Sequence, residues 1–100
     1  MQVYVENNVT GRGNWFSLPL PKKELRSLLE EKHIISSDGT YQMSLLQYES
    51  FPPQEATGNL FSLNDKVANF ENLPDEQKSL LLSIAFSEGL SLETVFDYFL

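Results

Sequence analysis

The stretch Gln-Val-Tyr-Val-Glu-Asn at residues 2–7 indicates the fold class of this chain. Polar and apolar side chains alternate along it, and Val and Tyr favour extended backbone, so it predicts a β-strand. Turn-forming residues that include Gly11 and Gly13 follow, and residues 14–18 then resume a strand pattern with two aromatic side chains. We expect these two strands to pair in antiparallel fashion across the glycine-containing loop.

A helix is predicted after prolines end the second strand. Pro21 suits a first helical turn, because the N–H that proline lacks would have no partner there. Leu25, Leu28 and Leu29 share one face at helical spacing. The helix is expected to end near residues 32–33, before a turn of Ser, Asp and Gly.

A third strand is predicted over residues 40–50, which carry Tyr, Met and Leu side chains. Its alternation slips at residues 45–46, and such a slip is typical of a β-bulge. The two prolines at residues 52–53 end this strand, and residues 54–59 are expected to form a short linker.

Helix signals replace strand signals beyond this linker. Ser62 and Asp65 have the spacing of a capping box. Pro74 suits the start of a helix, and Gly89 suits its end. Ser91 is expected to cap a last helix.

The predicted fold class is α+β. A small three-stranded antiparallel sheet with one helix forms a first domain at residues 1–59, and a short helical bundle forms a second domain at residues 60–100. Hydrophobic residues make up 41% of the 100 residues, which suffices for a buried core. A broad apolar face is expected on one helix of the bundle, formed by Leu80, Leu81, Ile84 and Ala85.

The negative charge is concentrated in the second part of the chain. Fourteen acids and seven bases give a net charge of −7. Residues 34–100 hold ten acids against Lys66 and Lys78, a balance of −8, whereas residues 1–33 hold four acids against five bases. Such a surface repels nucleic acid and anionic lipid and attracts basic surfaces. The alternative interpretation is a surface that serves only solubility.

Catalytic side chains are scarce. The chain has no cysteine, which excludes disulfides and thiolate chemistry. His33 is the single histidine, and a small hydrolase or metal site built on it would need Asp38, Glu30 or Glu31 as a partner. A histidine at a helix end more often interacts with the helix dipole. We therefore expect no enzyme activity, no metal and no cofactor.

Three further features favour a structural interpretation over nucleic-acid binding. Gly11-Arg12-Gly13 lacks the full phosphate-binding pattern and is typical of a hairpin turn. The basic residues within 22–26 are too few for phosphate-driven binding. Four aromatic side chains could stack on bases but are expected to pack within the fold: Trp15, Phe16, Tyr41 and Tyr48.

The N-terminal residues lack the basic start and apolar region of a signal peptide. No apolar run approaches the roughly 20 residues of a membrane span. We expect a cytoplasmic protein that neither contacts a membrane nor binds nucleic acid directly.

Several motifs, taken in order, resemble the ArdA-type antirestriction proteins, and the likeness covers nearly the whole chain. Two departures are Gln47, where that family usually has Asp, and the family's greater length, with a third domain and a dimer contact. The likeness rests on Val3-Tyr4-Val5, Gly13-x-Trp15-x-x-Leu18-Pro19, Tyr48-Glu49 before Phe51-Pro52, residues 63–73, and Ser87-Glu88-Gly89-x-Ser91-Leu92-Glu93.

The resemblance implies an elongated DNA mimic, carried by mobile genetic elements, that binds type I restriction–modification enzymes and blocks their access to DNA. A protein–protein adaptor of a mobile element with the same fold is the alternative. The mimic surface is expected to comprise the ten acids of the second part: Asp38, Glu49, Glu55, Asp65, Glu71, Asp75, Glu76, Glu88, Glu93 and Asp97.

The C-terminal end is apolar and is expected to contact a partner or a second copy in a homodimer. Phe96, Phe99 and Leu100 are the residues assigned to this contact.

Overall fold

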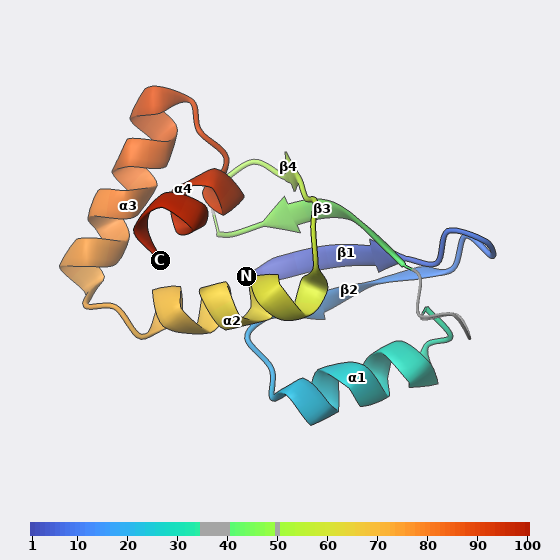
Figure 1. Cartoon of the computed structure of the whole chain (residues 1–100). Helices are drawn as coiled ribbons and strands as arrows, with labels where there is room; N and C mark the ends of the chain where they lie inside the picture. Colours follow the sequence, from blue (N-terminus) through green and yellow to red (C-terminus); the bar gives the residue numbers. More distant parts are fainter. Residues whose placement is uncertain (35–40, 50) are drawn as a thin grey trace.

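The computed structural model describes residues 1–34, 41–49 and 51–100. Within these residues the chain forms four strands and four helices, in a body of 41 × 24 × 21 Å (Figure 1). The elements are β1 (Gln2–Glu6), β2 (Gly13–Ser17), α1 (Lys22–Glu31), β3 (Gln42–Gln47), β4 (Gln54–Glu55), α2 (Leu60–Glu71), α3 (Asp75–Glu88) and α4 (Leu92–Phe99).

The strands form one antiparallel sheet in the order β2-β1-β3-β4. The predicted α+β class and the antiparallel pairing of the first two strands are confirmed, with Tyr4 opposite Trp15. The linker prediction was wrong at residues 54–55, which pair with β3 as a fourth strand. Two residues are too short a run to show the alternation by which a sequence reveals a strand.

The bulge predicted in the third strand is present. The pairing of β1 with β3 passes from Tyr4 opposite Leu45 to Val5 opposite Met43, which leaves Ser44 as the extra residue. The bulge reverses the alternation, so Met43 is buried on the same side as residue 46 while Leu45 faces outward, 36% exposed.

Helices α1 and α2 lie along the lower side of the sheet in Figure 1, and α3 and α4 lie at the end opposite the β1–β2 loop. Helix α2 begins earlier than the Ser62 capping box predicts. The side chain of Asn59 accepts hydrogen bonds from the backbone N–H of Phe61 (2.8 Å) and Ser62 (3.2 Å) and caps the helix instead. Asparagine at this position satisfies two N–H groups that the helix itself leaves unpaired.

The ends of α3 and α4 follow the prediction. Gly89 has the left-handed backbone (φ 65°) that closes α3, and the N–H of Leu90 donates to the carbonyl of Ala85 at 2.9 Å. Ser91 then caps α4, its hydroxyl accepting from the N–H of Thr94 at 3.2 Å.

One cluster of buried side chains draws on the sheet and on all four helices. Phe70 of α2 and Phe96 of α4, both fully buried, lie with ring centroids 5.1 Å apart. The buried Asn64 of α2 accepts from the N–H of Leu20 and donates to its carbonyl, at 2.9 and 2.7 Å. The core therefore includes residues from both sides of position 59–60, and the division into two domains there stays a prediction.

Candidate functional site

The acids assigned to the surface differ in exposure. Asp38 lies outside the described residues. Glu71 and Glu93 are half-buried, and the others are exposed: Glu49, Glu55, Asp65, Asp75, Glu76, Glu88 and Asp97.

Both lysines of residues 34–100, the acidic part of the chain, form ion pairs with carboxylates. Lys66 of α2 pairs with Asp97 of α4, and Lys78 of α3 lies 3.7 Å from carboxylate oxygens of both Glu71 and Asp75. Among the described residues of this part, five exposed acids therefore take part in no ion pair: Glu49, Glu55, Asp65, Glu76 and Glu88.

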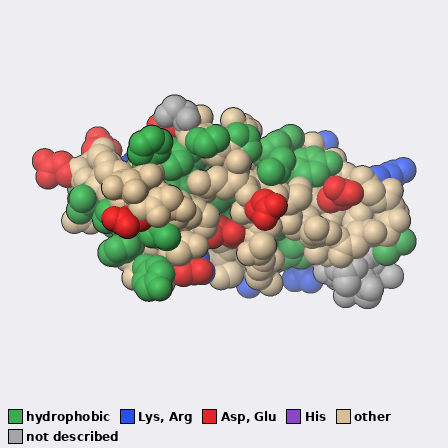
Figure 2. All heavy atoms as spheres, turned by 90° about the horizontal axis from the view of Figure 1, so that it is seen from above, with side chains coloured by type: hydrophobic (Ala, Val, Ile, Leu, Met, Phe, Trp, Pro, Cys, Tyr) green, Lys and Arg blue, Asp and Glu red, His purple; other side chains and the backbone are tan. Residues whose placement is uncertain are grey.

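Figure 2 shows how charge is arranged on one face of the molecule. Carboxylates stand apart from one another on this face, with uncharged and hydrophobic side chains between them, and they form no continuous stripe. Lysine and arginine side chains gather toward one end. On this face the carboxylates are not laid out as a regular phosphate-like row.

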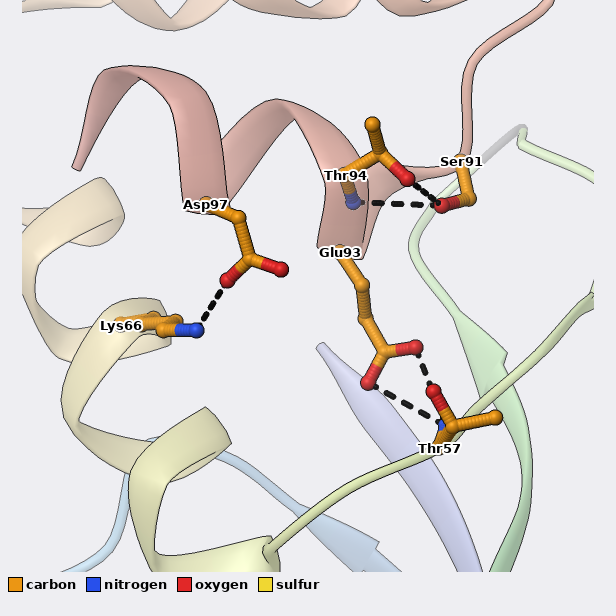
Figure 3. A network of polar contacts seen from close by, with 6 residues as sticks. All are labelled: Thr57, Lys66, Ser91, Glu93, Thr94 and Asp97. Atoms are coloured by element: carbon orange, nitrogen blue, oxygen red, sulfur yellow. Dashed lines mark hydrogen bonds and ion pairs between the residues drawn. The ribbon is translucent and has the colours of Figure 1, made fainter.

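A groove of about 660 Å³ lies between α4, α2 and the segment that joins β4 to α2. Glu93 and Asp97 extend from successive turns of α4 into this region (Figure 3). Both oxygens of the Glu93 carboxylate accept from the N–H of Thr57, at 3.0 and 3.3 Å. This contact joins α4 to the segment between β4 and α2. Asp97 reaches Lys66, which holds α4 against α2.

The environment of Glu93 distinguishes it from the other acids. Burial raises the pKa of Glu93 above its ordinary value, and the charge of Asp97 adds to this effect. The hydrogen bonds from Thr57 and the charge of Lys66 oppose the rise without cancelling it. Glu93 therefore forms an internal contact between segments 36 residues apart, and its assignment to a partner surface stays a prediction.

A second polar hollow, of about 470 Å³, surrounds Tyr48 and is also lined by Glu49, Glu71 and Gln47. Burial, together with the charges of Glu71 and Glu49, raises the pKa of Tyr48 to about 12. The phenol therefore keeps its proton at neutral pH and can donate a hydrogen bond, but it cannot act as a base.

The apolar contact predicted at the C-terminus requires a correction. Phe96 is fully buried in the core, because its place on α4 turns it toward Phe70, so it is not a surface residue. Phe99 and Leu100 are exposed, at 55% and 38%. Tyr98, which precedes them, is also exposed.

Sequence reasoning missed a further exposed set on α3. Leu80 and Phe86 are exposed, at 59% and 81%, although Leu80 was assigned to the broad apolar face of this helix. Leu81 and Ala85 are buried as predicted. Six of the seven residues from 80 to 86 are apolar, which is more than one helical face can bury, so the sequence did carry a signal.

The remaining features have structural roles. Gly11 has a positive φ of 73° in the β1–β2 turn, as expected for a hairpin loop. His33 also has a positive φ, 56°, and closes α1 where the N–H of Ile34 donates to the carbonyl of Leu29. Among the residues that the structure describes, no three histidine or acidic side chains come together as a metal site.

The four aromatic side chains do not form one platform. Phe16 is buried, the Tyr41 hydroxyl accepts from the N–H of Leu60 at 2.9 Å, and Tyr48 packs edge-on against Phe70. Only Trp15 is exposed, at 40%, beside Tyr4 with ring centroids 5.5 Å apart.

No protein-family model matches this chain, and neither a curated protein nor a solved structure matches it significantly. Of the helices in the described ranges, none is both long and apolar enough to cross a membrane.

Proposed function

We propose that this chain is an antirestriction protein, a DNA mimic that binds type I restriction–modification enzymes and occupies their DNA-binding groove. Its motifs resemble those of the ArdA type, and its acidic part suits a cationic groove. The proposal implies a cytoplasmic protein that acts by binding and not by catalysis.

The engagement of Lys66 and Lys78 is the observation that carries this proposal. Because no other base lies in residues 34–100, nothing in that part of the sequence remains to neutralise its five unpaired acids. A cationic groove would meet a net negative surface and would release its counterions on binding, as it does with DNA.

The size of the molecule limits how much DNA one copy can imitate. Duplex DNA carries one charge per 1.7 Å, or roughly 24 charges over a length of 41 Å. The chain has fourteen acids offset by seven bases. One copy therefore replaces part of a DNA footprint, and its charges act chiefly on the rate and orientation of encounter.

The test is a binding titration against a purified type I methyltransferase at increasing salt. Replacing Glu76→Gln and Glu88→Gln removes two unpaired acids, and it should weaken binding and make it less dependent on salt. The matched control is Glu24→Gln with Glu31→Gln, two exposed acids of α1, which changes the net charge equally and should leave binding nearly unchanged. Binding that is absent, or insensitive to salt, would refute the mimic.

The exposed apolar side chains of α3 and α4 favour the second candidate, an adaptor of a mobile element. An adaptor has a target other than the methyltransferase, and for binding to that target Tyr98→Ser with Phe99→Ser should abolish binding while the charge variants should not. Phe96 is left unchanged because it belongs to the core.

A further inference from the structure

The outer face of the sheet carries an aromatic pair that the proposed function leaves unused. Val3 and Val5 of β1 are buried in the core. Tyr4 and Glu6, at the alternate positions of the same strand, therefore lie on the opposite, outer face. Trp15 of β2 lies directly opposite Tyr4, with the ring centroids 5.5 Å apart and the ring planes tilted by 57°. Because the Trp15 side chain is 40% exposed, the pair presents aromatic surface to solvent.

The ring of Tyr4 lies over Gly13, a position without a side chain. Gly13 is opposite Glu6 in the register of β1 with β2, and a Cβ atom at Gly13 would overlap the phenol of Tyr4. Alternate residues of one strand have Cα atoms about 7 Å apart. The Tyr4 ring and the Glu6 carboxylate therefore border the same small area beside Trp15.

The chemistry of this area favours a cation. The four strands contain the acids Glu6 and Glu55 and no lysine or arginine. Within the described residues Glu6 takes part in no ion pair, and the one cation–π contact is that of Lys22 with Phe61. Arg12, the nearest base in the sequence, therefore covers neither the rings nor Glu6. The face of an aromatic ring is the negative part of its quadrupole, so the rings and the carboxylate attract the same kind of group.

We propose that Trp15, Tyr4 and Glu6 bind an arginine side chain of a cationic partner. A guanidinium is planar, so it can stack on an aromatic ring while its N–H groups donate to a carboxylate, whereas the ammonium of lysine is a compact point charge. Because the proposed function already makes the partner cationic, this site rests on that function and names the side chain that the sheet recognises. A nucleobase also stacks on aromatic rings, but the net charge of −7 repels nucleic acid.

The probe is a short labelled peptide with two arginines in a glycine–serine sequence. It is compared with a lysine peptide of equal charge and with a peptide of citrulline, the uncharged isostere of arginine. The arginine peptide should bind most tightly and change the fluorescence of Trp15, which is the single tryptophan of the chain. Trp15→Leu should weaken its binding, followed by anisotropy of the label, about fivefold, as loss of an exposed cation–π contact does. Phe86→Leu is the control, because Phe86 is an exposed aromatic residue of α3.

Glu6→Gln tests the carboxylate without removing the rings. It should weaken binding of the arginine peptide more than Glu24→Gln does, although both variants change the net charge equally. Glu24 is an exposed acid of α1 and lies outside the sheet. Circular dichroism confirms that each variant keeps its fold.

Equal binding of the arginine and lysine peptides, or unchanged binding after Trp15→Leu, would overturn the inference. So would a citrulline peptide that binds as tightly as the arginine peptide, or a single-stranded oligonucleotide whose binding depends on Trp15. Self-association in sedimentation that Trp15→Leu abolishes would assign the face to a second copy instead. Failure of the methyltransferase titration with peptide binding intact would refute only the antirestriction function.

Discussion

At the scale of single residues, contacts decide what each acid does. Composition predicts ten acids in residues 34–100 but cannot separate Glu88, which takes part in no ion pair, from Asp97, which is paired with Lys66. The ion pair of Lys66 with Asp97 forms only because the fold brings together two positions that are 31 residues apart. Glu93 is the clearest case, since only the fold places it against Thr57.

Glu93→Gln should make the protein more stable at neutral pH. Burial raises the pKa of Glu93 in the folded protein. The stability that protonated Glu93 contributes is therefore complete below the ordinary pKa of a glutamate, and it is lost as pH rises through the raised pKa of the folded state. Glutamine keeps an oxygen that accepts from Thr57 but never ionises. Urea unfolding at about pH 4 and about pH 7 should show the gain only at the higher pH.

The control for this prediction is Glu88→Gln, which changes an exposed acid that lies in no ion pair. A Glu93→Gln protein that is less stable than the parent at both pH values would show that the charged carboxylate strengthens the contact with Thr57.

At the scale of elements, local signals worked where one residue dictates backbone geometry. Gly89 and Ser91 were correctly placed at the junction of α3 and α4, because a left-handed end and a hydroxyl cap need no distant partner. The start of α2 was misplaced because Ser62 and Asp65 offered a plausible cap just after the true one, Asn59. Strand β4 was missed because only its backbone pairing with β3 defines it, and its two side chains show no strand pattern in the sequence.

Asn59→Ala should destabilise the protein by about 1 kcal/mol, because two N–H groups of α2 lose their acceptor. Ser62→Ala should change stability by less than about 0.5 kcal/mol, since this exposed serine does not cap the helix. Chemical denaturation of both variants measures the difference, and a larger loss in Ser62→Ala would contradict the assigned cap.

At the scale of the whole molecule, the α+β class was predictable from the switch between strand and helix periodicity. The core that the two parts of the chain share was not predictable, because each part has enough apolar side chains in a regular pattern to suggest a core of its own. Phe96 illustrates this point: the sequence analysis assigned it with Phe99 to a partner contact, and only the fold shows that it packs against Phe70 while Phe99 is left exposed.

Phe96→Ala should cost about 3–5 kcal/mol, because it leaves a cavity among buried side chains from both parts of the chain. Phe99→Ala is the matched control and should cost much less, since its ring is 55% exposed. Thermal unfolding followed at Trp15 should shift with Phe96→Ala if the sheet and the helices unfold together. A Trp15 transition that does not move would favour two independent domains.

Helices α3 and α4 hold five acids against one base, Lys78, and lie at one end of a body 41 Å long, so the charge of the molecule is distributed unevenly along it. A body with unevenly distributed charge experiences a torque in the field of an approaching cationic surface, and it turns before the two molecules touch. The end that carries α3 and α4 lies opposite the β1–β2 loop, and a cationic surface would attract this acidic end more strongly than the other. Orientation during approach would increase the share of collisions that begin with the helices facing the partner.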